Sequence, residues 1–207
     1  LLKCMVRLLE PDSGEIYIEG NNVLHLNPKE LNDVRKHLGF LFQGAALYDS
    51  MSVRENLEFP LIRHFNFTPK EREDKVKSVL EKVSLEEAID KMPSELSGGM
   101  KKRIGLARSI ISEPKLMLYD EPTTGLDPIT SKEISSLILE LQKSLNMTSV
   151  IVTHDLLCAE IIADRAIVLN EGIVQHAGTI AELTTSSDHF LRNFFSHEIV
   201  EDQNRRN

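Results

Sequence analysis

Polar side chains follow three apolar runs that each predict a strand. Gln43 follows the first run, Asp120 and Glu121 close the second, and His154 follows the third. Because the carboxyl ends of parallel strands face the ligand crevice of an α/β sheet, we expect these side chains to converge at one edge. A metal ligand, a general base and a hydrogen-bonding sensor could be assembled there.

Asp120 and Glu121 have the chemistry of a metal ligand and a base. A carboxylate fixed at a strand end, such as that of Asp120, suits Mg²⁺, which keeps several waters and bridges substrate phosphates. Glu121 could polarise an attacking water, a role worth about 10²–10⁴ in rate. A solvated acidic pair is the alternative, and for two residues alone it is preferred. The continuation Pro122–Asp127 favours the functional interpretation.

The stretch Ser97-Gly98-Gly99 comes directly before a helical pattern. Ser97 is a good N-cap, and the two glycines leave the first-turn amides uncovered. Uncovered amides at a helix N-terminus form an anion site that the helix dipole favours. An ordinary capped helix after a loop is the alternative.

His154 and Gln43 are less specific signals. A lone histidine is more often a core residue bonded to a carbonyl, and Gln43 could equally be a surface amide. The position of His154 at a strand end, directly before Asp155, favours a side chain that faces a ligand.

Strands and helices alternate along the chain, which predicts an α/β fold with right-handed βαβ units around a parallel sheet. Leu1–Leu9 has the apolar spacing of a helix, and Glu15–Glu19 alternates like a half-buried strand. Thr68–Glu71 predicts a capping box, Asp127 with Pro128 predicts the start of a helix, and Asn170–Gly172 predicts a turn. Apolar runs predict buried strands at 38–42 and 116–119 and further strands at 149–153 and 166–169.

One domain with an inserted helical part is expected. Residues 44–113 are helical in pattern and interrupt an α/β core made of residues 1–43 and 114–185. Residues 186–207 form a tail with an apolar stretch and a charged end.

The composition is that of a globular protein with a sizeable core. Of the 207 residues, 27% are charged and 41% hydrophobic, and 24 Lys and Arg against 32 Asp and Glu give a net charge of −8. This balance argues against a broad nucleic-acid surface, so no nucleic-acid partner is expected.

Cys4 and Cys158 form no motif and are expected to be packed thiols. No apolar run reaches the length of a membrane span, so a partner is expected to carry the protein to any membrane at which it works.

The ordered set of motifs resembles that of the ATP-binding cassette (ABC) ATPases. Leu96–Gly99 is similar to their signature motif, the strand ending in Asp120-Glu121 to Walker B, Gly125–Asp127 to the D-loop and His154 to the H-loop. The resemblance covers nearly the whole chain. It implies an α/β fold with a RecA-like parallel-sheet P-loop NTPase core and an inserted α-helical subdomain.

The resemblance also implies ATP and Mg²⁺ as cofactors. Asp120 and Gln43 would be metal-binding residues, and Gln43 would relay the nucleotide state to the helical subdomain. Glu121 and His154 would be the catalytic residues, with His154 contacting the γ-phosphate and holding the attacking water in line.

A second, identical ATPase subunit is implied as a partner. In the family, the residues at Ser97, Gly98 and Gly99 bind the γ-phosphate of ATP held by the other subunit, and the residue at Asp127 lies at the same interface. Met100 stands where most members have Gln, a departure that leaves the amide groups in place.

The stretch Gly39–Leu57 indicates one branch of the family. Together with Lys101–Arg103 and Tyr119, it is similar to the ATPases of Mla-type phospholipid transporters, which work with MCE-domain lipid-binding proteins. The implied partners are an integral-membrane permease, MCE proteins and STAS-domain proteins, at the cytoplasmic face of the bacterial inner membrane. A permease contact is expected near 47–61, although most apolar residues there are expected to pack internally.

The phosphate-binding (Walker A) motif Gly-x-x-x-x-Gly-Lys-Ser/Thr does not occur in the 207 residues. In relatives it directly precedes the helix with which this sequence begins, so an N-terminal truncation that removes the first strands and the P-loop is expected. These residues alone are expected to bind ATP weakly and not to hydrolyse it, whereas the full-length parent is expected to be active.

Three alternatives stay open. The ATPase of an amino-acid or other small-solute importer would share the superfamily, and neighbouring genes would distinguish it. A soluble ABC ATPase of DNA repair or translation would carry coiled coils or tandem cassettes, and the sequence shows neither. A truncated, non-catalytic fragment that serves as an interaction module is the third.

Overall fold

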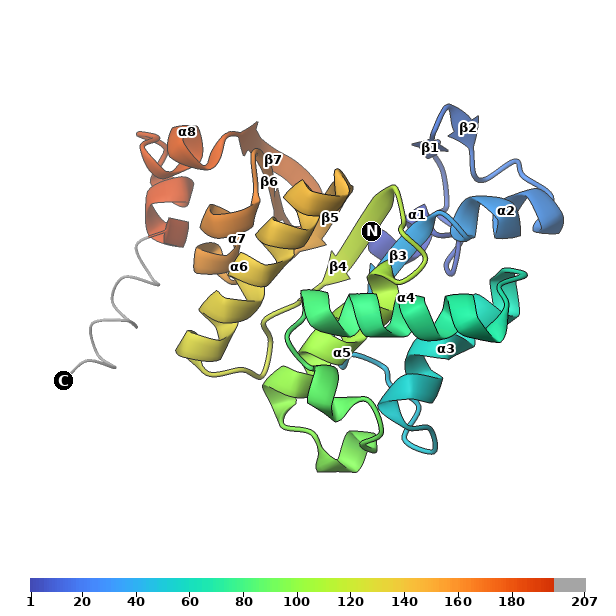
Figure 1. Ribbon diagram of the computed structural model, residues 1–207. Helices are drawn as coiled ribbons and strands as arrows, with labels where there is room; N and C mark the ends of the chain where they lie inside the picture. Colours follow the sequence, from blue (N-terminus) through green and yellow to red (C-terminus); the bar gives the residue numbers. More distant parts are fainter. Residues whose placement is uncertain (196–207) are drawn as a thin grey trace. The chain divides into compact units, whose positions relative to one another are not determined.

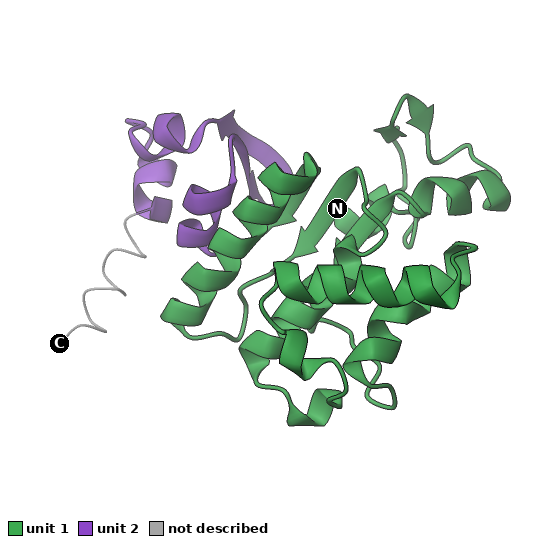
Figure 2. Cartoon of the chain, viewed as in Figure 1, with its two compact units in different colours: residues 1–152 green, residues 153–207 purple. Residues whose placement is uncertain are grey.

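The chain forms two compact units. The computed structural model describes residues 1–195; the first unit is Leu1–Val152 and the second begins at Thr153 (Figure 2). Residues 196–207, which belong to the predicted tail, lie outside the described residues. The division into core, inserted subdomain and tail stays a prediction.

A three-stranded parallel sheet organises the first unit (Figure 1). Its strands lie in the order β3 (Leu38–Leu41), β4 (Leu116–Asp120) and β5 (Thr148–Val152). Both outer strands pair with β4 in parallel, and Asp120 lies opposite Val152 at the carboxyl end. The predicted α/β architecture with a parallel sheet is confirmed.

The N-terminal segment covers part of this sheet. Leu2 and Val6 pack against Leu118 in the middle strand. The helix predicted at the start is too long, because Arg7 has a φ of 53°, which an α-helix cannot continue through. The strand predicted at 15–19 shortens to two residues. The elements here are α1 (Leu2–Met5), β1 (Tyr17–Ile18), β2 (Asn21–Asn22) and α2 (Pro28–Arg35).

Helices connect β3 to β4. They are α3 (Val53–His64), α4 (Pro69–Lys82), the short η1 (Glu86–Ala88) and η2 (Pro93–Glu95), and α5 (Gly98–Ile110). The predicted capping box is present at Thr68 and Glu71, and a second one begins α3. α3, α4 and α5 contact one another, and α5 also contacts β3. α5 therefore joins the helical group to the sheet.

α6 (Pro128–Leu145) connects β4 to β5. Asp127 is its N-cap and Pro128 its first residue, as the sequence predicts. The helix ends at Leu145, and its C-cap, Asn146, takes the left-handed conformation with a φ of 49°.

The second unit contains α7 (Leu156–Ile162), β6 (Ala166–Asn170), β7 (Ile173–Gly178) and α8 (Ile180–Thr184). β6 and β7 form an antiparallel hairpin that the sequence pattern does not predict. Its two-residue turn, Glu171 and Gly172, has φ values of 48° and 78°, which match the twist of a hairpin. Val168, Leu183 and Leu191 form the core of this unit. No helix of the described residues combines the length and apolar character that crossing a membrane requires.

Candidate functional site

Glu121 takes an unusual backbone conformation directly after β4. Its φ of 50° lies in the left-handed region, and its N–H donates to the carbonyl of Val152 at 2.9 Å. A non-glycine residue in this conformation costs about 1–3 kcal/mol and persists where surrounding groups hold it. Contacts around Glu121 must therefore offset this cost.

Thr124 holds the Glu121 side chain. Thr124 Oγ1 donates to Glu121 Oε2 at 3.1 Å, and the Thr124 N–H reaches the Glu121 carbonyl at 3.3 Å. Both residues are half-buried. A carboxylate fixed in this way is suited to orient a water, as a general base must.

Lys102 of α5 joins the ends of two strands. Its side chain is buried, and Nζ donates to the peptide carbonyls of Gln43 and Glu121, the latter at 3.2 Å. Because one nitrogen reaches both carbonyls, the backbones of Gln43 and Glu121 lie side by side. Burial lowers the pKa of Lys102, while the carboxylates of Glu121 and Asp120 favour its charged form.

Arg108, also on α5, holds the segment after Gln43. Its guanidinium donates to the carbonyls of Ala45 at 3.0 Å and Ala46 at 2.8 Å. Both alanines have a left-handed backbone conformation, with φ values of 60° and 51°. Burial lowers the pKa of Arg108, although a guanidinium stays charged at physiological pH. The loop after β3 is thus fixed from α5 at the carbonyl groups of Gln43, Ala45 and Ala46.

The donor set near Asp120 fits Mg²⁺. Asp120 ends β4 half-buried, and Gln43 lies two residues past β3 with an exposed side chain. Carboxylate and amide oxygens are hard donors, and Mg²⁺ is often bound by only one or two protein groups, with water and phosphate completing its shell. Within residues 1–195, no group of three or more His, Cys, Asp or Glu side chains could hold a metal ion. Asp120 and Gln43 are thus the donors that Mg²⁺ could use here, beside water and phosphate.

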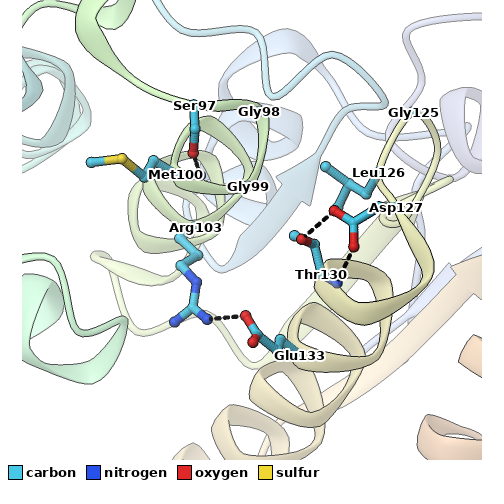
Figure 3. Close-up of a pocket in the computed structure, with 10 residues that line it drawn as sticks. All are labelled: Ser97, Gly98, Gly99, Met100, Arg103, Gly125, Leu126, Asp127, Thr130 and Glu133. Atoms are coloured by element: carbon cyan, nitrogen blue, oxygen red, sulfur yellow. Dashed lines mark hydrogen bonds and ion pairs between the residues drawn. The ribbon is translucent and has the colours of Figure 1, made fainter.

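A separate pocket of about 440 Å³ lies between the start of α5 and the start of α6 (Figure 3). The residues that line it are Ser97–Met100 and Arg103 on one side and Gly125–Asp127, Thr130 and Glu133 on the other. Ser97 Oγ accepts from the Met100 N–H at 3.2 Å, so Ser97 is the predicted N-cap. Among the described residues, no acceptor bonds the N–H groups of Gly98 and Gly99. These two amides are therefore available to an anion.

The opposite wall of the pocket is held by Asp127. Its carboxylate accepts from the Ile129 N–H at 3.0 Å. It also accepts from the Thr130 N–H at 3.0 Å and from Thr130 Oγ1 at 2.5 Å (Figure 3). The Thr130 bonds hold the pKa of Asp127 below its usual value. Arg103 bridges the two walls through an ion pair with Glu133 at 3.1 Å.

The predicted residues of the first unit lie in two groups. Gln43, Asp120 and Glu121 lie at the carboxyl edge of the sheet, and Ser97–Gly99 share a pocket with Asp127. His154 belongs to the second unit, where its side chain is exposed and precedes α7.

The sequence pattern does not identify Lys102 and Arg108 as residues that fix the loops of the site. In the sequence, Lys102 stands out only as part of a basic run. A signal is present, because Lys102 shares a helix stripe with the buried Leu106, Ser109 and Ile110. A charged residue on a buried stripe requires a polar partner inside the protein. Which partner it finds is decided by the fold.

Comparison with known proteins gives consistent results. A family described as "ABC transporter" matches residues 1–124. The intermembrane phospholipid transport system ATP-binding protein MlaF of Haemophilus influenzae is 42% identical over 188 residues, which are 91% of this chain and 71% of that protein. The methionine import ATP-binding protein MetN of Carboxydothermus hydrogenoformans is 36% identical over 97% of this chain. The chain spans only 59% of that protein's length.

Solved structures with the same fold are also similar in sequence. The ATP-binding cassette MJ0796, solved as a dimer in a post-hydrolysis state with ADP and Pi, has a TM-score of 0.77 and 32% identity, covering 86% of this chain and 78% of its own. CbiO1 of Clostridium perfringens, part of the ABC transporter complex CbiONQ, has a TM-score of 0.82 and 29% identity, covering 95% and 81%.

Proposed function

Because this chain belongs to the ATPase family of ABC transporters, we propose that it acts as an ATP-hydrolysing subunit in which Glu121 is the general base. The observation that carries the proposal is the fixed position of Glu121. Its carbonyl accepts from Lys102 and its carboxylate from Thr124. Asp120 and Gln43 would bind Mg²⁺ beside it, and that ion would draw charge from the phosphates during hydrolysis.

A second subunit completes the nucleotide site in this proposal. The unbonded N–H groups of Gly98 and Gly99 would bind the γ-phosphate of ATP held by a partner copy, and Asp127 would lie at the interface. A protein described as a dimer, the cassette MJ0796, supports this arrangement. His154 would contact the phosphate of the ATP held by its own chain.

The proposed cargo is phospholipid. The relative with 42% identity is an intermembrane phospholipid transport protein, which favours an Mla-type system with MCE and STAS-domain partners at the cytoplasmic face of the inner membrane. Import of methionine or another small solute is the second candidate, because a methionine import protein matches 97% of the chain at 36% identity.

A permease would bind beside the loop after β3. Tyr48 is 44% exposed and Ile62 59%, and the rings of Tyr48 and Phe59 lie 5.0 Å apart. Arg108 lies over the Tyr48 ring at 5.7 Å. This exposed apolar group on the helical segment suits an amphipathic helix of a membrane subunit.

Hydrolysis is tested with Glu121→Gln. The assay uses the complete gene product. The amide cannot accept a proton from water, so kcat should fall by about 10²–10⁴, while ATP stays bound and stabilises a dimer. Glu140→Gln, an exposed change on α6, is the matched control. Parental hydrolysis by Glu121→Gln removes Glu121 from the base role.

The cargo is tested with the partners. The complete gene product is combined with the permease and MCE protein of an Mla-type system, in vesicles that contain labelled phospholipid. ATP-dependent transfer of the lipid supports the phospholipid proposal. Hydrolysis stimulated instead by a methionine-loaded binding protein supports the second candidate.

A further inference from the structure

Lys102 occupies a position where a cation is costly. The side chain is only 5% exposed, and it lies on the same stripe of α5 as the buried Leu106 and Ile110. An apolar side chain of similar length would avoid the loss of hydration that a buried ammonium suffers. The ammonium must therefore find its partners inside the protein.

Those partners are the two peptide carbonyls that flank the proposed catalytic edge. Nζ donates to the carbonyl of Gln43 and, at 3.2 Å, to that of Glu121. The two acceptors come from segments 59 and 19 positions away in sequence. One side chain thus fixes the end of β3 relative to the end of β4.

Three residues whose carbonyls accept from the cations of α5 have a left-handed backbone conformation. Glu121 has a φ of 50°, and its carbonyl is held by Lys102; Ala45 and Ala46 have φ values of 60° and 51°, and theirs are held by Arg108. The backbone conformation of each of these residues depends on where its carbonyl is held. Without Lys102, Glu121 loses one of the contacts that keep it in a conformation that glutamate rarely adopts.

We infer that Lys102 is a positioning residue for ATP hydrolysis: it holds the peptide of Glu121 beside that of Gln43, and so keeps the Glu121 carboxylate in place. This role rests on the proposed function of Glu121 as the base. Lys102 itself touches neither nucleotide nor metal in this scheme. It also makes the position of the base depend on the loop after β3, the segment beside the proposed permease contact.

The first test compares three variants of the complete gene product. Lys102→Met keeps the apolar length and removes the ammonium, Lys102→Arg keeps the charge, and Lys101→Met is the control one position away. Lys102→Met should lower kcat about 10–100-fold, the effect of a misplaced group, and change KM for ATP less than about threefold. The kcat of Lys102→Arg should be at least about threefold higher than that of Lys102→Met. The kcat of Lys101→Met should equal that of the parent.

A double variant separates positioning from damage to the fold. In the Glu121→Gln background there is no carboxylate to position, so adding Lys102→Met should change the residual rate less than about twofold and leave the ATP bound per subunit unchanged. An equal loss of rate in both backgrounds, or a kcat within about twofold of the parent for Lys102→Met alone, overturns the inference. Parental hydrolysis by Glu121→Gln instead overturns the proposed base.

Hydrogen exchange tests the contact without relying on activity. Amides in 38–47 and 116–126 should exchange at least about threefold faster in Lys102→Met than in Lys101→Met, because both carbonyls lose their common donor. Unchanged exchange in both segments overturns the inference even in a preparation that does not hydrolyse ATP. If Lys102→Met is recovered unfolded, Lys102→Arg is measured in the same way, and parental exchange there supports the inference.

Discussion

α5 carries two polar regions that differ in whether their hydrogen-bond donors have acceptors. At its open end, Gly98 and Gly99 present N–H groups that no acceptor among the described residues bonds. On its inner face, Lys102 and Arg108 are matched by backbone carbonyls of the same unit. The open end has donors that await a ligand, whereas the inner face is already satisfied.

The difference separates binding from positioning on a single helix. An anion site must stay uncovered, and glycine leaves it so because it has no side chain. A positioning site must be filled, since a buried cation without acceptors would destabilise the fold. Changes at the open end should therefore affect association with nucleotide and partner, and changes on the inner face should affect the rate and the stability.

The largest effect is expected at the open end, for Gly99→Val in the complete gene product. Even a Cβ at Gly99 would lie 2.9 Å from Thr130 Cγ2, so valine pushes the pocket walls apart and covers the amides. Losing charge-assisted hydrogen bonds of about 1.5–3 kcal/mol should weaken ATP-dependent dimerisation about 100-fold. Ultracentrifugation of the Glu121→Gln protein with ATP measures it.

Two controls sharpen this prediction. Ser94→Val, exposed and shortly before the motif, should leave dimerisation unchanged. Lys102→Met should also leave it within about threefold, although it lowers kcat. Equal weakening by Gly99→Val and Lys102→Met would show that the two regions of α5 do not have separate roles.

A smaller effect is expected for Gly105→Ala on the inner face. Its Cβ would lie 2.8 Å from Ala45 Cβ and 3.2 Å from Ala45 Cα. Overpacking costs about 1–3 kcal/mol, and the helix propensity of alanine returns about 1 kcal/mol. Unfolding by urea should therefore show a net loss of about 1 kcal/mol.

Ala45→Gly provides the matched rescue. It removes the opposing Cβ, and glycine fits the left-handed φ of 60° at this position. The double variant should regain the parental midpoint. A double variant no more stable than Gly105→Ala alone would place the strain elsewhere.

The smallest effect is expected at Asp127, on the pocket wall opposite the open end. Bonds from Thr130 lower its pKa in the folded protein, so its stabilising contribution is present at neutral pH and is lost as the pH falls through the folded value. An asparagine at this position would keep the capping oxygen but could not titrate. Asp127→Asn should therefore show a smaller drop in Tm than the parent when the pH is lowered from neutral to about 3. An equal drop in both proteins contradicts this assignment.

The sequence predicts many helix caps and strand ends, because contacts between residues close in sequence determine these features. The Thr68 capping box, the Asp127 cap with Pro128 and the strand that ends at Asp120 all appear where the sequence places them. The sequence predicts the hairpin turn at Glu171 and Gly172, but it does not predict the strand after it, because that strand alternates only weakly.

The order of the motifs, the caps of the helices and the chemistry available at each strand end follow from the sequence alone, because they depend on residues within a few positions of one another. The bonds from Lys102 to Gln43 and Glu121, and the left-handed backbone of Glu121, emerge only in the folded chain. The partners of a buried cation are carbonyls from distant segments. Since every residue has a carbonyl, no residue type marks which of them the fold will bring to the cation.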